Sequence, residues 1–143
     1  MIYLFIIVIT VFISQTLKFV GRSFSLSTKI NKDIIWTYLW ATGAPSTHSA
    51  ALVAALTMLY KDTGPSTLFA FCLLVAVVFM YNLVADRTKE EIQETFFAKG
   101  DTAERKIVMT GRVMDISGHS FFDIITGIIT GFLCAQLLLN LLQ

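Results

Sequence analysis

The chain has 143 residues, 55% of them hydrophobic, and its mean hydropathy is +0.71. This composition excludes an ordinary soluble domain and suffices for about four membrane-spanning helices of roughly 20 residues each. The formal net charge of +1, without a basic patch, excludes a typical nucleic-acid-binding surface. Cys72 and Cys134 lie in apolar stretches without metal-ligand spacing, so we expect both to be small buried hydrophobic side chains.

The first predicted element is a membrane-spanning helix over residues 2–20, an apolar stretch of adequate length. We expect this helix to be retained, because the segment has no basic N-terminal region and no small-residue cleavage site typical of a signal peptide. Lys18 lies inside its C-terminal end, and Arg22 lies just beyond it. The position of Arg22 fits a membrane-surface anchor better than a catalytic residue, whereas that of Lys18 fits both roles equally well.

A short apolar segment over residues 34–42 follows a polar connection. It is too short to span a bilayer and is rich in tryptophan and tyrosine, which predicts a re-entrant or interfacial helix. Gly43 and Pro45 end this segment. Ser46 is then a suitable N-cap for a helix that covers residues 47 to about 60.

Two more apolar helices are predicted, separated by one long polar stretch. A tight turn at residues 61–65 leads into a helix that is apolar over residues 68–84 and is expected to end at residues 86–87. Residues 86–117 are polar, with a partial apolar stripe that indicates an amphipathic segment on the membrane or bundle surface. The last span is expected over about residues 120–142.

Together these elements predict an all-α integral membrane bundle of about four spans, with one re-entrant or interfacial helix and one amphipathic polar segment. We expect the whole chain, residues 1–143, to form a single membrane-embedded domain. Following the chain back and forth across the bilayer brings most of its chemically useful residues to one membrane face. These residues are Lys18, Arg22, His48, Arg87, Arg112, His119 and Asp123.

The only two histidines, His48 and His119, each lie where a polar segment meets an apolar helix. Polar groups at membrane depth are costly, so they are functional candidates, and helix N-termini attract anions such as phosphate. Asp123 follows His119 by four residues, which places its carboxylate where it can fix the imidazole tautomer for nucleophilic attack. His48 suits proton donation to a leaving alkoxide, because its reference pKa of about 6.5 is close to neutral pH.

Other interpretations of these residues stay open. Either histidine is compatible with a structural role, and the pair Ser46-Thr47 is compatible with helix capping alone. Two histidines and a carboxylate are enough ligands for zinc, but no H-E-x-x-H pattern is present and the surrounding basic residues oppose a cation. We therefore predict no metal and no cofactor. The basic side chains suit a phosphate group instead, arginine through forked contacts and lysine as a point charge.

Two motifs connect these residues to a known superfamily. The segment Pro45-Ser46-Thr47-His48 is similar to Pro-Ser-Gly-His, and Arg112 followed by His119-x-x-x-Asp123 is similar to Arg…His-x-x-x-Asp. Both are motifs of the type 2 phosphatidic acid phosphatase superfamily, which the chain therefore resembles.

The order of the motifs more closely resembles a divergent bacterial and plant branch of that superfamily. Its small membrane proteins are called acid phosphatase/vanadium-dependent haloperoxidase-related. That branch has Gln-x-x-Lys in the first helix, matched here by Gln15-Thr16-Leu17-Lys18. It also has Met-Tyr-Asp…Arg, to which Met80-Tyr81-Asn82…Arg87 is similar. The resemblance extends over nearly the whole chain.

The resemblance implies a role for each residue. His119 would be the nucleophile that forms a phosphohistidine, Asp123 would orient it, and His48 would protonate the leaving group. The phosphate would be held by a further set of residues, with Arg87 and Arg112 as alternatives for one position. This set comprises Lys18, Ser46, Thr47, Arg87 and Arg112.

These observations predict a metal-independent membrane phosphatase whose partners are the bilayer and a lipid phosphate substrate, either a phosphomonoester or an isoprenyl (di)phosphate. The alternative is a non-catalytic membrane module that binds an anionic lipid headgroup or a partner. We expect a bacterial inner-membrane protein. Its site-bearing face should be cytoplasmic, because that face carries all Lys and Arg residues except Lys61.

Overall fold

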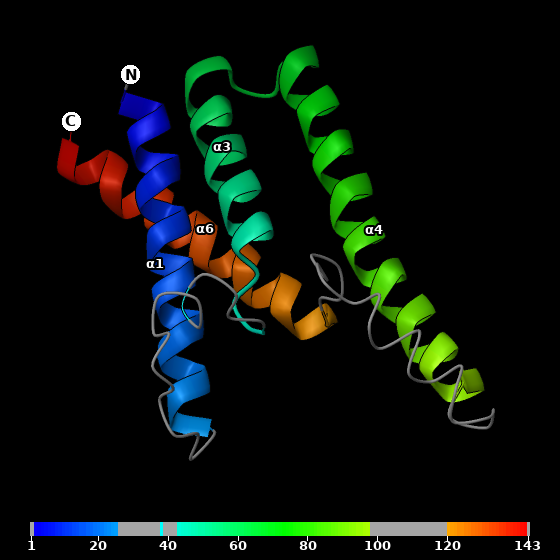
Figure 1. Cartoon of the computed structure of the whole chain (residues 1–143). Coiled ribbons are helices and arrows are strands. Elements are labelled where there is room, and N and C mark those ends of the chain that lie inside the picture. Colours follow the sequence, from blue (N-terminus) through cyan, green and yellow to red (C-terminus); the bar gives the residue numbers. More distant parts are fainter. Residues whose placement is uncertain (1, 26–37, 39–42, 98–119, 143) are drawn as a thin grey trace.

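The computed structural model describes residues 2–25, 38, 43–97 and 120–142 (Figure 1). Within these residues the chain is helical and has no strand, as the sequence predicts. The four helices are α1 (Ile2–Ser25), α3 (Thr47–Thr63), α4 (Thr67–Phe97) and α6 (Phe121–Leu142).

Three helices have the length and apolar composition needed to cross a membrane: α1, α4 and α6. The fourth predicted span, α3, has 17 residues and is shorter than a typical spanning helix. The prediction of an all-α membrane bundle is therefore confirmed, with three helices of clear membrane-spanning length in the described part. The expected interfacial helix at 34–42 lies outside the described residues, apart from Tyr38.

Side-chain caps define the helix starts that the sequence suggested. The Ser46 hydroxyl accepts a hydrogen bond from the Ser49 amide and is the N-cap of α3. The Ser66 hydroxyl accepts from the Phe69 amide at 3.1 Å, so it caps α4 in the same way. Gly64 ends α3 with a positive φ of 62°, which glycine adopts without strain, and its amide donates to the Tyr60 carbonyl.

The helix predicted to be apolar over residues 68–84 does not end at residues 86–87, so that prediction is wrong. Helix α4 continues to Phe97, so the first part of the polar stretch extends the apolar helix. Residues 86–97 contain neither glycine nor proline and include three glutamates, one arginine, one lysine and one glutamine, all of which favour helix. The rest of the expected amphipathic segment, residues 98–117, lies outside the described residues.

Helices α3 and α6 cross in close contact at two glycines. A Cβ atom on Gly127 or on Gly131 would lie less than 3.0 Å from the backbone of α3, at Ser46 and Ala50 respectively. This is the small-residue spacing that lets membrane helices approach without a side chain between them. Figure 1 shows α6 running obliquely across α1 and α3 at this crossing.

A small hydrophobic cluster marks one end of the three-helix core. Ile6 of α1, Met58 of α3 and Leu139 of α6 are all buried there. At the same end the Tyr3 hydroxyl donates a hydrogen bond to the Asp62 carboxylate. Helix α1 therefore runs antiparallel to α3 and α6, and the end of α1 lies near the starts of the other two.

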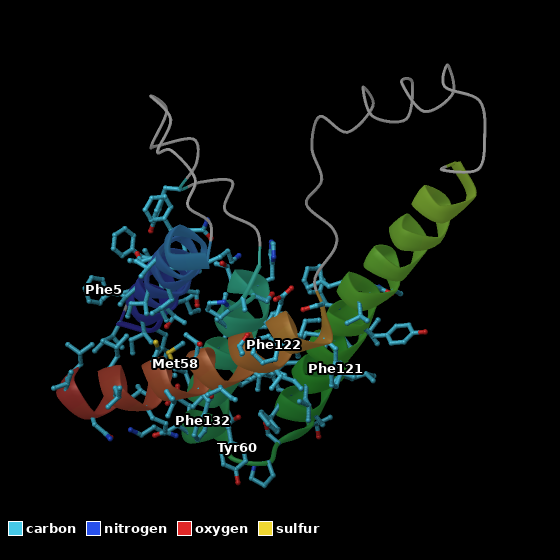
Figure 2. The ribbon with its side chains drawn as sticks, turned by 90° about the horizontal axis from the view of Figure 1, so that it is seen from below. Phe5, Met58, Tyr60, Phe121, Phe122 and Phe132 are labelled. Carbon is cyan, nitrogen blue, oxygen red and sulfur yellow. The ribbon has the colours of Figure 1, made fainter. Side chains whose placement is uncertain are left out.

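The polarity of the two faces of α1 is the reverse of that of an amphipathic helix in a soluble protein. Its inner face carries the buried side chains Thr10, Ser14 and Lys18, whereas Phe5 and other large apolar residues are exposed. Figure 2 shows Phe5 outside α1, and Phe121 and Phe122 at the exposed start of α6. Apolar side chains facing outward and polar ones inward are expected where lipid is the solvent.

Candidate functional site

The structure brings five of the predicted site residues to the same end of the bundle. Lys18 comes from the last part of α1, Ser46, Thr47 and His48 from the start of α3, and Asp123 from the first turn of α6. Hydrogen bonds join the end of α1 to the start of α3, and the start of α3 to the start of α6.

The other predicted site residues are placed only in part. Arg22 lies on α1 beyond Lys18, and Arg87 lies on α4 beyond Phe79; their side chains are outside the described part of the structure. Arg112 and His119 lie outside the described residues. The nucleophilic role of His119 therefore remains a prediction, as does the choice between the two arginines.

Lys18 is anchored on α3 through Thr47. Its side chain is only 5% exposed, and its ammonium group donates a hydrogen bond to the Thr47 hydroxyl at 3.1 Å. The same hydroxyl donates to the side-chain oxygen of Gln15 at 3.0 Å. A buried ammonium group is costly unless it is paired, so this contact supports a specific role for Lys18 over that of a lipid-surface anchor.

Gln15 continues the connection to the segment between α1 and α3. Its amide nitrogen donates to the Tyr38 carbonyl at 2.6 Å. The Tyr38 ring lies against Phe12 and Phe19 of α1, with ring centroids 6.2 Å and 5.7 Å away, and its hydroxyl lies 3.0 Å from the Thr16 hydroxyl. Tyr38 is thus docked on α1 at the level of the site.

Ser46 links the starts of α3 and α6. Its amide donates to the Asp123 carbonyl at 2.8 Å, while its hydroxyl accepts from the Ser49 amide and lies 3.2 Å from the Ser49 hydroxyl. Ser46 is completely buried. Its capping role is therefore seen directly, and its proposed role in phosphate binding remains a prediction.

Asp123 and Ser120 cap the start of α6 through two reciprocal hydrogen bonds. The Ser120 amide donates to the Asp123 carboxylate at 2.8 Å, and the Asp123 amide donates to the Ser120 hydroxyl at 3.1 Å. This arrangement is the capping box of a helix N-terminus. The carboxylate is 7% exposed and attracts the Lys18 ammonium group, so it also balances the buried positive charge.

Two of these contributors were absent from the predicted site. Gln15 precedes Lys18 by three residues, a spacing that places both on neighbouring parts of one helix surface. Ser120 precedes Asp123 by three residues, which is the sequence signature of a capping box. Both signals were therefore present in the sequence.

His48 lies on the side of α3 that faces α4. Its ring centroid is 6.2 Å from that of Phe79, and the positive charge of Lys18 is close enough to act on it. The imidazole is exposed while it feels the charge of the lysine. This position is compatible with proton transfer to a substrate atom that enters between α3 and α4.

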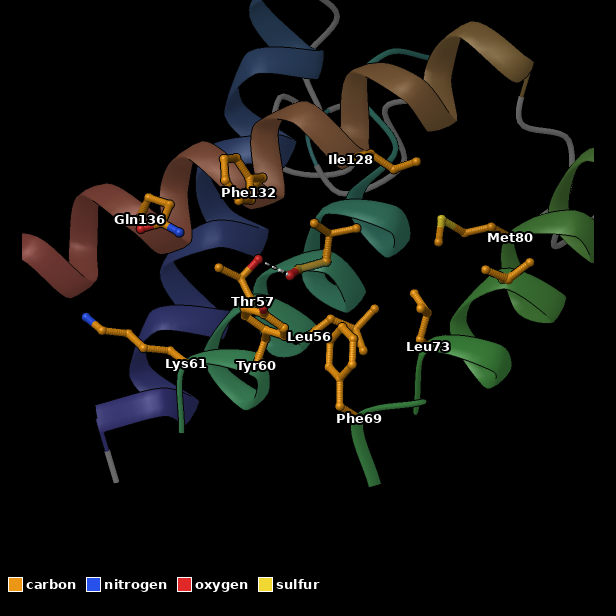
Figure 3. A pocket seen from close by; sticks show the side chains of 12 residues that line it. Leu56, Thr57, Tyr60, Lys61, Phe69, Leu73, Met80, Ile128, Phe132 and Gln136 are labelled. Atoms are coloured by element: carbon orange, nitrogen blue, oxygen red, sulfur yellow. Dashed lines mark hydrogen bonds between the residues drawn. The ribbon is translucent and has the colours of Figure 1, made fainter. Parts of the chain in front are cut away.

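An apolar groove of about 870 Å³ lies between α3, α4 and α6 (Figure 3). Met80 and Ile128 line one end, and Tyr60 and Lys61 line the other. Met80 follows Phe79, the residue that lies against His48, so the groove reaches the level of the site. Among the described residues, no three His, Cys, Asp or Glu side chains come together as a possible metal site.

Comparison with known proteins supports one family assignment. No curated protein and no solved structure matches the sequence significantly. The sequence profile of the Divergent PAP2 family matches residues 2–134, which is nearly the whole chain and includes every predicted site residue. The chain belongs to the Divergent PAP2 family.

Proposed function

We propose that the protein is a membrane lipid-phosphate phosphatase that works through a phosphohistidine intermediate without a metal. The observation that carries this proposal is the meeting of Lys18, Thr47, His48 and Asp123 at one end of the bundle, beside an apolar groove. Basic groups and the α3 N-terminus suit the phosphate, while the groove suits an acyl or isoprenyl chain.

The proposed reaction divides the work between the two histidines. His119 attacks the phosphorus atom, and the bond from phosphorus to the lipid oxygen breaks as His48 gives that oxygen its proton. Water then attacks the phosphohistidine and passes a proton to His48. This second step releases inorganic phosphate and restores both imidazoles.

The other residues would hold the transferred group. Lys18 supplies positive charge, Ser46 and the backbone amide of Thr47 offer contacts at the N-terminus of α3, and Arg87 or Arg112 provides a forked contact. Asp123 would orient His119 by accepting a hydrogen bond from one ring N–H group. The substrate class is a phosphomonoester or an isoprenyl (di)phosphate of the membrane.

The proposal is tested by phosphate release from the detergent-solubilised protein across a panel of lipid phosphates. Wild type should release phosphate from at least one of them, and His119→Ala should not. Equal background rates for the two proteins would overturn the enzyme assignment. Saturable binding of a lipid phosphate without release would instead support a membrane module that binds an anionic headgroup.

A further inference from the structure

The hydrogen bonds around Thr47 have only one consistent direction. The Tyr38 carbonyl can only accept, so the nearby side-chain nitrogen of Gln15 must be its NH₂ group. The Gln15 oxygen then faces Thr47 and requires a donor, which is the Thr47 hydroxyl proton. The Thr47 oxygen is therefore left to accept from Lys18, whose ammonium group can only donate.

This direction has a consequence for the site. Because the Thr47 proton is committed to Gln15, the Thr47 hydroxyl presents lone pairs to the lysine and not a donor to a phosphate. The ammonium group is thereby held beside the first residue of α3, where backbone N–H groups already favour an anion. One of its three protons is used on Thr47, and an anion at the start of α3 could accept from another.

We infer that Gln15 and the Thr47 side chain are positioning residues that fix the Lys18 ammonium group at the phosphate subsite. The inference rests on the proposed function for the identity of the ligand. The positioning itself is a property of the hydrogen-bond chain that runs from Tyr38 through Gln15 and Thr47 to Lys18. Gln15 and the Thr47 hydroxyl would act through Lys18 and not by contact with the phosphate.

The first experiment measures binding of inorganic phosphate to the full-length protein in detergent. Thr47→Val keeps the shape of threonine but removes the acceptor, so the Kd for phosphate should rise about tenfold. Gln15→Met should raise it about fivefold, because the Thr47 proton loses its acceptor. Thr47→Ser retains the hydroxyl and should restore the Kd to within about twofold of wild type.

A double variant separates positioning from a general disturbance of packing. If both residues act through one chain of bonds, Gln15→Met combined with Thr47→Val should bind phosphate as Thr47→Val does. Thr16→Val is the matched control, because Thr16 lies beside Gln15 and contacts the Tyr38 hydroxyl but takes no part in the chain. The Kd of Thr16→Val for phosphate should equal that of the wild-type protein. Additive losses, or an equal loss in Thr16→Val, would overturn the inference.

The second experiment needs neither phosphate nor turnover. The rate at which Lys18 is acetylated by acetic anhydride, followed by mass spectrometry, should increase severalfold in Gln15→Met and Thr47→Val and stay unchanged in Thr16→Val. Unchanged rates in all three would overturn the positioning role. If these rates change but wild type neither binds nor hydrolyses phosphate, the positioning role stands and the proposed function fails.

Discussion

The backbone amide of Ser46 donates a hydrogen bond of 2.8 Å to the backbone carbonyl of Asp123. This single bond joins the residue that caps α3 to the residue that completes the cap of α6. Because both partners are main-chain atoms, this bond between the starts of the two helices does not depend on a particular side chain. The side-chain groups of the site are therefore carried on a fixed junction.

Asp123 has two roles that one substitution can separate. Asp123→Asn keeps an oxygen for the Ser120 amide, so the helix cap should survive, but the buried Lys18 loses its balancing charge and the free energy of unfolding should fall by at most about 3 kcal/mol. The lost charge can no longer stabilise an imidazolium, so phosphatase activity should fall by about 10²–10⁴-fold. Thermal unfolding in detergent and phosphate release measure the two effects. Asp123→Asn with wild-type activity would show that the carboxylate serves the helix cap alone.

The crossing of α3 and α6 predicts a difference between two glycines. Gly131→Ala would force a Cβ atom against the α3 backbone at Ala50 and should destabilise the protein by about 1–3 kcal/mol. Gly21→Ala is the matched control, because nothing lies within 4 Å of a Cβ atom there and alanine favours helix. Unfolding in detergent should show a lower transition temperature for Gly131→Ala only. Equal temperatures would contradict the close crossing.

The proposed division of labour between the histidines predicts different responses to the leaving group. An activated aryl phosphate leaves without protonation, so it should partly restore activity in His48→Ala. It should not restore His119→Ala, which lacks the nucleophile. Turnover of an aryl phosphate and of a lipid phosphate by both variants is the measurement. Identical losses on both substrates would reverse this assignment.

The two candidate arginines can be distinguished by substitutions that keep their charge. Arg87→Lys should remove most of the activity, because lysine cannot make the forked contact to two phosphate oxygens. Arg112→Lys should then be nearly as active as wild type. Phosphate release by the two variants decides between them. An active Arg87→Lys with an inactive Arg112→Lys would assign the phosphate to the polar segment.

The distribution of charge predicts the orientation in the membrane. Lys61 lies at the end opposite to Lys18, beside the Tyr3–Asp62 contact, while the other Lys and Arg residues belong to segments expected at the site end. Short basic segments remain in the cytoplasm, so the site should face inward in a bacterial inner membrane. Lys99→Cys, in a protein with Cys72→Ser and Cys134→Ser, should resist an impermeant maleimide in intact cells. Rapid labelling would place the site outside.

The sequence alone determined the class of the fold and most helix starts. Apolar stretches of sufficient length predict membrane helices, and Ser46 at a change from polar to apolar sequence predicts a cap. The predicted end of α4, at residues 86–87, is wrong for a physical reason. A change from apolar to charged residues marks where a helix leaves the membrane, but residues 86–97 favour helix in water as well.

Which polar groups meet depends on the tertiary structure. Thr47 contacts Gln15 and Lys18 across about thirty positions of sequence, and Gly131 meets Ala50 at the helix crossing. These contacts depend on how each helix is rotated about its axis. In a soluble protein an apolar stripe fixes that rotation, because one face must avoid water. Here lipid accepts apolar side chains all around, so the rotation is set by close packing and buried hydrogen bonds between helices.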